Sequence, residues 1–336
     1  MRVACILVAG FLVVGLAPSA SALETDQFYA WGRPLEDATD VLNAKVNMEI
    51  EKALAEVNGS ARARRSTCRD AHEKIVDRFR YPIFIKIETW AQNTPVVDRI
   101  PATPEEELAF RQEYLYAGTF RLDIVRWMPP SPTILVDGVR TGTDKLSHFF
   151  SEGLFYHWLY RKARKKGLDH EAAERRATEL GILTERTVLG LSSSGVLSRA
   201  DLEANYQGMR FYDGLCDADD PVLEKAESGW RMKRPFDFRD YVSPEWDESW
   251  QPSIFGRLRW KSVAPMIARY CPLLDDPSVR AQRASYAARD RETLSEGLVG
   301  EMVARGKLKA PASFSIESVC ATQAAAALSG GPLRSH

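Results

Sequence analysis

The 336-residue sequence lacks several features that would identify a protein class at once. Beyond an apolar run near its start, no stretch reaches the ~18 consecutive apolar residues that a membrane-spanning helix requires. Its 45 basic and 46 acidic side chains nearly cancel, so the composition does not predict a nucleic-acid-binding face. No C-x-x-C pair occurs, which argues against a thiolate zinc site. Residues 190–195 do not fit the G-x-S-x-G motif of serine hydrolases, because Ser194 stands where the second glycine belongs.

The first 22 residues have the pattern of a secretory signal peptide. Arg2 precedes an apolar run from Val3 to Leu16, and Ala20-Ser21-Ala22 is typical of a cleavage site. No cysteine follows the run directly, so a lipoprotein signal is not evident. We expect an exported chain that is periplasmic or extracellular, that begins near Leu23 and that has no transmembrane segment.

Four of the five cysteines lie beyond the predicted signal peptide: Cys68, Cys216, Cys271 and Cys320. An even number of cysteines in an exported chain predicts a disulfide framework. Two disulfides are therefore expected. Three pairings are open, and the sequence does not choose between them.

The hydrophobic periodicity predicts a mainly α fold: one compact helical domain over residues 23–328, followed by a disordered tail at 329–336. A small β-hairpin is expected where Phe120 to Ile124 alternates, where residues 133–136 are apolar, and where Asp137-Gly138 forms a turn. Residues 217–254 are polar, interrupted by proline and rich in aromatics, which indicates a long irregular segment that wraps the helices. The expected helices are 35–57, 62–80, 82–90, 103–117, 141–166, 171–180, 182–191, 198–208, 260–270 and 276–306.

Two segments, 141–152 and 192–208, contain the candidate site. Asp144, His148 and Glu152 are spaced four residues apart, and Asp201 and Asn205 repeat that step. This spacing places each set on one face of a helix. The helix that follows Asp144 is apolar almost all round, which is typical of a buried helix. If the two faces meet, they form a compact cluster of carboxyl, imidazole and amide groups.

The cluster has three interpretations. His148 can serve as a general acid or base, oriented by Asp144 or Glu152, with Asp201, Glu203 or Glu185 across a cleft. Alternatively, His148 with Asp144 or Glu152 can ligate a divalent metal, although the two carboxylates lie about 12 Å apart along an ideal helix and need ligands from another helix. In the third interpretation the cluster is a structural network: Asp144 and Asp201 cap helices, Glu152 pairs with Arg199 or Arg210, and His148 is a satisfied core histidine.

Three further features of the sequence are alternative candidates for a functional site. His157 falls on an apolar helix face, which favours core packing, and His170 is a weaker candidate. The segment Trp246-Asp-Glu-Ser-Trp250 places paired carboxylates between tryptophans, a pattern compatible with binding or hydrolysing a glycan. Its alternative role is a surface loop held in place by its aromatic side chains.

Two motifs carry a resemblance to known families. Asp144-Lys145-x-x-His148-Phe149 resembles the D-K-x-x-H-F signature of VanZ-like and YfiM-like bacterial envelope proteins. Together with a later S-G-x-x-S-x-A-D-L-x-A-N-x-x-G pattern, it is similar to uncharacterised exported bacterial envelope proteins. That later pattern is formed by Ser194, Gly195, Ser198, Ala200, Asp201, Leu202, Ala204, Asn205 and Gly208. The resemblance implies an envelope location and carries no reaction with it.

Taken together, these observations predict an exported helical protein, with two hypotheses for its function. The first is a hydrolase that acts on an envelope component such as a glycan or a lipid, with His148, Asp144, Glu152, Asp201 and Asn205 at its site. The second is a non-catalytic envelope binding or structural protein whose polar cluster fixes the packing of its helices.

Overall fold

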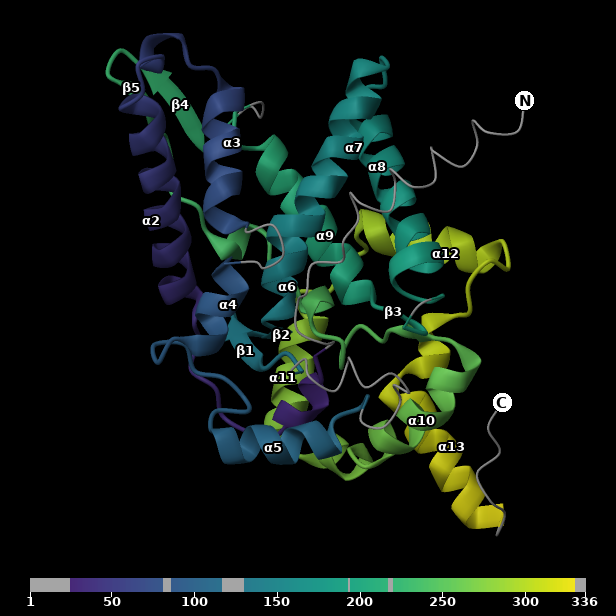
Figure 1. Cartoon of the computed structure of the whole chain (residues 1–336). Helices are drawn as coiled ribbons and strands as arrows, with labels where there is room; N and C mark the ends of the chain where they lie inside the picture. The colour runs from purple at the N-terminus through teal and green to yellow at the C-terminus, as the bar shows by residue number, and fades with distance from the viewer. Residues whose placement is uncertain (1–24, 81–85, 117–129, 193, 217–219, 330–336) are drawn as a thin grey trace, which may run out of the picture.

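The computed structural model describes residues 25–80, 86–116, 130–192, 194–216 and 220–329 (Figure 1). The predicted signal peptide, the alternating segment 120–124 and most of the predicted tail lie outside these residues. The described part of the chain is mainly helical, with small antiparallel pairs of strands, so the predicted fold class is confirmed. Among the residues described, none of the helices combines the length and apolar character that crossing a bilayer requires.

The α-helices are α2 (Thr39–Asn58), α3 (Cys68–Phe79), α4 (Lys86–Asn93), α5 (Pro104–Glu113), α6 (Asp144–Ser147), α7 (Gly153–Lys165), α8 (His170–Thr184), α9 (Arg199–Asp213), α10 (Arg257–Ala268), α11 (Pro277–Ala287), α12 (Leu294–Ala304) and α13 (Ile316–Ser329). Two π-helical segments, η4 (His148–Glu152) and η5 (Glu185–Leu189), directly follow α6 and α8. The strands pair as β1 (Thr133–Val136) with β2 (Val139–Gly142), β3 (Val196–Leu197) with β6 (Ile254–Phe255), and β4 (Leu223–Ala226) with β5 (Gly229–Met232).

The predicted hairpin exists, and its described strands are β1 and β2. Asp137 and Gly138 form its two-residue turn with φ angles of 50° and 70°, the left-handed values that such a turn demands. Val136 pairs with Val139 and Thr133 with Gly142. Because Thr141 belongs to β2, it does not cap the next helix as the sequence predicted. That helix begins at Asp144, after Thr143.

Helices α7, α8 and α9 pack together, with α7 and α8 in the upper part of the view and α9 nearer the middle of the molecule (Figure 1). The helix α9 approaches η4 so closely that a Cβ atom on Gly208 would lie 1.9 Å from the carbonyl oxygen of Phe149. Gly153 is equally close, because its Cβ would lie 2.6 Å from Gly208 Cα. These two glycines allow the backbones of the site helices to touch, which brings their polar side chains together.

Two further predicted helix boundaries also differ from the structure. Gly181 does not end α8, which continues to Thr184 because the ring of Tyr156 packs where a Cβ on Gly181 would be, 1.9 Å from Tyr156 Cζ. The expected helix 276–306 is two helices, α11 and α12, separated by residues 288–293. In contrast, the predicted caps at Thr103, Asp169 and Ser198 each accept the expected backbone N–H.

The aromatic-rich segment was predicted to be irregular and to wrap the helices, but its aromatic side chains enter the core and it contains the hairpin of β4 and β5. Its buried rings pack around Phe149 and Phe150, and they are Phe236, Phe238, Tyr241 and Trp246. A second apolar core lies between α10, α12 and α13. The two disulfides are Cys68–Cys216, which ties α3 to the end of α9, and Cys271–Cys320, which ties α13 to the segment after α10.

Candidate functional site

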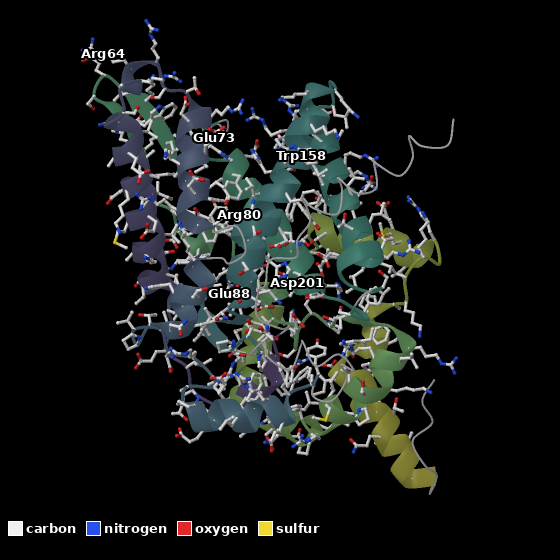
Figure 2. The ribbon with its side chains drawn as sticks, in the orientation of Figure 1. Arg64, Glu73, Arg80, Glu88, Trp158 and Asp201 are labelled. Carbon is white, nitrogen blue, oxygen red and sulfur yellow. A yellow bond between two sulfur atoms is a disulfide. The ribbon has the colours of Figure 1, made fainter. Side chains whose placement is uncertain are left out.

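Side chains from three distant parts of the chain meet at one buried point. The segment α6–η4 supplies Asp144, Lys145 and His148, and α9 supplies Asp201 and Asn205. The turn after residues 244–246 supplies Glu248. Asp201 lies near the middle of the molecule, whereas Arg64 lies at its edge (Figure 2). The two helix faces predicted from the i, i+4 spacing therefore do meet.

The ammonium group of Lys145 is the centre of this cluster. Its Nζ atom lies 2.7 Å from Asp144 Oδ2, 2.6 Å from Asp201 Oδ1 and 2.6 Å from Glu248 Oε1. The side chain is 0% exposed. The ammonium group donates hydrogen bonds to Asp144 Oδ2 and Glu248 Oε1 and forms an ion pair with Asp201 Oδ1. We define these four residues as the lysine cluster.

The carboxylates of the lysine cluster have further partners that hold them in place. The Thr25 hydroxyl donates to Asp144 Oδ1 over 2.6 Å, and the Ser198 hydroxyl donates to Glu248 Oε1 over 3.1 Å. Ser198 is also the N-cap of α9, where its hydroxyl oxygen accepts from the backbone N–H of Asp201. Asp201 thus lies in the first turn of α9, where the positive end of the helix dipole favours a carboxylate.

His148 lies beside the cluster with both ring nitrogens facing oxygen atoms. Nε2 is 3.3 Å from Asp201 Oδ2, and Nδ1 is 3.1 Å from the amide oxygen of Asn205. Burial alone would lower the pKa of His148, but the carboxylates of Asp201 and Glu152 outweigh it and raise that pKa to about 9. His148 has 17% of its side chain exposed, compared with 6% or less for the lysine cluster. It is therefore the group of this site that an outside molecule can reach best.

Two more carboxyl groups surround His148, one in each π-helical segment. Glu152 ends η4, four residues after His148, and its charge contributes to the raised pKa of that histidine. Glu185 begins η5, and burial raises its pKa to about 7, with the charge of His148 acting in the opposite direction. Local π-helical geometry is rare and is found frequently at functional sites. The site therefore includes, beside the histidine, a carboxyl group whose pKa is raised by burial.

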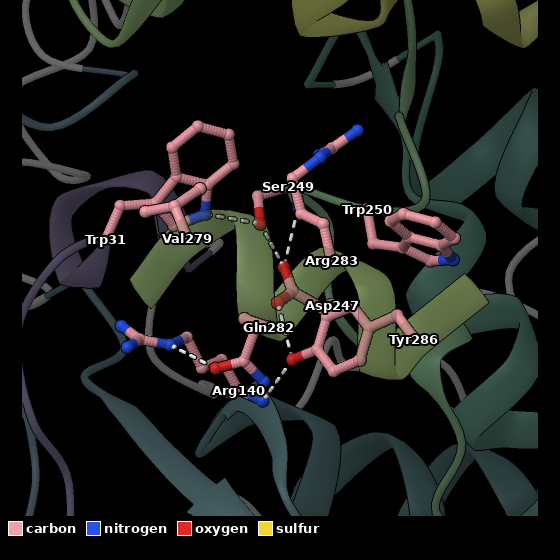
Figure 3. Close-up of a pocket in the computed structure, with 9 residues that line it drawn as sticks. All are labelled: Trp31, Arg140, Asp247, Ser249, Trp250, Val279, Gln282, Arg283 and Tyr286. Atoms are coloured by element: carbon pink, nitrogen blue, oxygen red, sulfur yellow. Dashed lines mark hydrogen bonds between the residues drawn. The ribbon is translucent and has the colours of Figure 1, made fainter. Parts of the chain in front are cut away.

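Asp247 and Glu248 point to different places, although they are neighbours in sequence. Glu248 enters the lysine cluster, whereas Asp247 accepts hydrogen bonds from Ser249 N (2.8 Å) and Tyr286 OH (3.0 Å). Figure 3 shows Asp247 in a small pocket between Trp31 and Trp250. The space in this pocket is about 10 Å³, close to the volume that one water occupies. The two carboxylates therefore do not converge on one point, so their geometry gives no support to the glycan interpretation of this segment.

Several alternative roles from the sequence are resolved by the contacts. Arg199 pairs with Glu296, and the guanidinium of Arg210 donates to Gln207. Glu203 accepts from Gln207 and Ser295 on another side of α9 and does not join the site. The hydroxyl of Ser194 donates to the carbonyl of Gly190, which makes it a turn residue. His157 packs in the core, stacked on His72 and Tyr160, and His170 contacts the hydroxyl of Tyr160 near the surface.

Three of the side chains at this site are close enough together to hold a metal ion. Asp144, His148 and Asp201 each offer one ligand atom, and these atoms lie within 4.8 Å of one another. Glu152, which the sequence also named as a metal ligand, is not part of this group. The donor atoms come from two helices, which the sequence analysis required.

Sequence reasoning missed two members of the site, Lys145 and Glu248. Lys145 stands inside the D-K-x-x-H-F motif, but a lysine next to a helix start is usually exposed. The available signal was its position on a helix that is apolar almost all round. Glu248 was considered only as the partner of Asp247, and its contact with Lys145 spans 103 positions in the sequence.

Comparisons of the chain with protein-family models, with curated proteins and with solved structures found no match. The resemblance to envelope proteins therefore stays a prediction that depends on the two motifs alone. The function has to be inferred from the geometry of the site.

Proposed function

We propose that the chain is an exported hydrolase that acts on a component of the cell envelope, a glycan or a lipid, with its reaction centre at His148. The observation that carries the proposal is the convergence of Asp144, Asp201 and Glu248 on the buried ammonium of Lys145. Burying charge is unfavourable unless every charge is paired. Strongly perturbed ionisable groups gather at functional sites, and here they surround the most exposed member of the site.

Each residue has a role in this proposal. His148 meets the substrate or the attacking water, and Asp201 and Asn205 orient its ring. Glu185 has a pKa of about 7, so near neutral pH it can accept a proton from water and return it to the leaving group. Lys145 is a positioning residue that fixes Asp201, and Glu152 adds negative charge beside the imidazole.

The export part of the proposal is supported by separate features. Residues 1–22 have the composition of a signal peptide. The disulfides Cys68–Cys216 and Cys271–Cys320 are typical of an oxidising compartment outside the cytoplasm. Processing is tested by expressing the full chain in a bacterial host and reading the N-terminal residue of the product by mass spectrometry. A start near Leu23 is the expected outcome, and retention of Met1 with a cytoplasmic location contradicts it.

The catalytic proposal is tested with a panel of chromogenic esters, phosphoesters, glycosides and peptides, followed by isolated envelope fractions. His148→Gln and Glu185→Gln are each expected to lower the rate at least ~100-fold, the low end of what a positioned proton-transfer group contributes. His170→Gln is the control, because His170 is 57% exposed and lies outside the site. Circular dichroism and melting temperature show whether each variant folds. Full activity in a folded His148→Gln protein would overturn the proposal.

A second candidate function has its own supporting observation. The side chain of Lys145 is 0% exposed, and its ammonium group forms ion pairs with three buried carboxylates of the protein itself. Such a closed network can fix the register of α6 against α9 in a non-catalytic binding or structural protein of the envelope. This alternative predicts that His148→Gln changes stability and leaves every measured activity of the preparation unchanged.

A further inference from the structure

Three ligand atoms stand close to the arrangement that a metal ion requires. His148 Nε2 and Asp201 Oδ2 are 3.3 Å apart. Two ligands of a tetrahedral zinc ion, with bonds of about 2.0–2.1 Å, lie roughly 3.4 Å from each other. The ligand atom of Asp144 is within 4.8 Å of both. Both oxygens of Asp144 have partners, Thr25 and Lys145, so this carboxylate exchanges one of these contacts for the ion when it completes a three-ligand set.

The partners around these ligands orient them toward one point. The amide oxygen of Asn205 accepts from His148 Nδ1, which leaves Nε2 to face Asp201. Histidine ligands of metals usually donate their other ring N–H to an oxygen in this way. Lys145 contacts Oδ1 of Asp201, so the second oxygen, Oδ2, is the one that faces His148. The lysine and an ion can therefore use different oxygens of the same carboxylate.

The charges of the cluster also favour a cation. The three carboxylates of the lysine cluster outnumber the two groups that can carry positive charge beside them, the ammonium of Lys145 and the imidazole of His148. The side chains of the lysine cluster are almost fully buried, where unbalanced charge is strongly unfavourable. A divalent cation that takes the place of a proton on His148 adds one positive charge to this cluster.

We propose that Asp144, His148 and Asp201 bind a divalent first-row transition metal, with Zn²⁺ as the ion that fits the ligand set best. A histidine ligand disfavours Ca²⁺ and Mg²⁺, which prefer oxygen ligands throughout. Three protein ligands are the pattern of catalytic zinc, whose fourth position holds water, whereas structural zinc has four protein ligands. The inference rests on the proposed hydrolase function, to which it adds the cofactor.

The reaction step follows from this arrangement. Asp144, His148 and Asp201 would hold the ion, which would lower the pKa of a water molecule at its fourth position. Glu185 would accept a proton from that water and return it to the leaving group. The water oxygen would bond to the electrophilic atom of the substrate as the bond to the leaving group breaks. Water is added across the broken bond, and nothing is oxidised or reduced.

Metal binding is measured on the mature protein after dialysis against a chelator. Zn²⁺ is added back, and the metal content is determined by mass spectrometry and the affinity by calorimetry. One Zn²⁺ per chain is expected. His148→Gln should weaken binding more than ~100-fold and Asn205→Ala about 10–100-fold, since loss of an outer partner typically has that effect.

His170→Gln is the matched control for this experiment. His170 and Glu174 are also four residues apart, and their Nε2 and Oε1 atoms lie 3.7 Å from each other. Neither residue belongs to the group of three side chains that could hold a metal ion. This variant should bind Zn²⁺ like the wild type. Equal affinity of the wild type and His148→Gln would overturn the inference.

A second measurement does not depend on the folding of any variant. Co²⁺ added to the metal-free wild-type protein should give the strong visible absorption of a low-coordinate site with nitrogen and oxygen ligands. A spectrum that stays that of aqueous Co²⁺ at stoichiometric addition would overturn the metal site. If the metal-free wild-type protein hydrolyses a substrate and His148→Gln does not, the metal site is also rejected, whereas the proposed hydrolase function stands. Stoichiometric zinc without hydrolysis of any substrate would keep the metal site and reject the hydrolase.

Discussion

His157 makes the stability of this protein depend on pH in a way that can be calculated. The side chain is buried among His72, Tyr160 and Tyr212. Burial, together with the neighbouring charge of His72, lowers the pKa of His157 to about 3. The folded protein therefore keeps this ring neutral at pH values where an unfolded chain, with a histidine pKa of about 6.5, protonates it.

The sign and size follow from proton linkage. A depressed histidine pKa contributes stability that is present above pH ~6.5 and is lost as the pH falls toward 3. At pH 5 the unfolded chain gains about 2 kcal/mol from binding this proton, and at pH 7 the gain is only about 0.2 kcal/mol. His157→Phe keeps an aromatic ring at the position and removes the proton site. Between pH 7 and pH 5, the free energy of unfolding of the wild type should therefore fall by about 2 kcal/mol more than that of His157→Phe.

Urea denaturation followed by circular dichroism at pH 7, 6 and 5 measures this difference. Other titrating groups are common to both proteins and cancel in the comparison. His170→Gln serves as the control, because it removes a histidine whose side chain is 57% exposed and not buried like that of His157. Parallel curves for the wild type and His157→Phe, within about 0.5 kcal/mol, would refute this account of the buried ring.

Three further predictions concern stability near the site. Lys145→Met leaves three buried carboxylates without their cation and should lower the free energy of unfolding by about 3–5 kcal/mol in urea denaturation. The control is Lys52→Met, at an ion pair whose lysine is half exposed, and it should change the free energy of unfolding by less than about 1 kcal/mol. Burial raises the pKa of Glu245 from 4.5 to about 7, so the free energy of unfolding of the wild type should fall by about 3 kcal/mol as the pH rises from 4.5 through 7. Glu245→Gln should abolish this fall. The same dependence of stability on pH in the variant and the wild type would contradict the raised pKa. Gly208→Ala should destabilise the folded protein by about 3 kcal/mol or more, because the new Cβ atom would meet a backbone oxygen. The control is Gly300→Ala, whose Cβ has nothing within 4 Å, and it should stabilise the protein by about 0.5–1 kcal/mol. Thermal and urea unfolding measure both effects.

Local signals in the sequence predicted the parts of the fold that depend on local physics. The hydroxyls of Thr103 and Ser198 accept the backbone N–H three residues ahead, and nothing distant is needed to predict these helix starts. The 3.6-residue period located α2, because one apolar face of a helix has to be buried. The i, i+4 spacing likewise predicted which side chains of α6 and α9 share a face.

Tertiary packing decided the features that the sequence did not predict. Gly181 is a helix breaker by local propensity, yet α8 continues through it because the Tyr156 ring needs the space of the missing side chain. The disulfide partners Cys68 and Cys216 are 148 positions apart, so their pairing depends on how α3 packs against the end of α9. Glu248 reaches Lys145 for the same kind of reason. A local pattern cannot show which distant carboxylate will approach a buried ammonium group.

The location of the lysine cluster argues for a function rather than for packing alone. Replacing a buried ion-pair network by apolar side chains is often neutral or stabilising by about 1–4 kcal/mol, so such a network is a poor device for holding helices together. The same chain segment already has the better device, because Phe149 and Phe150 follow His148 directly and pack in an aromatic core. Gly153 and Gly208 fix the approach of the same helices by backbone contact. Since register and packing are secured without any charge, the charged cluster beside His148 supports the proposed function more than the structural alternative.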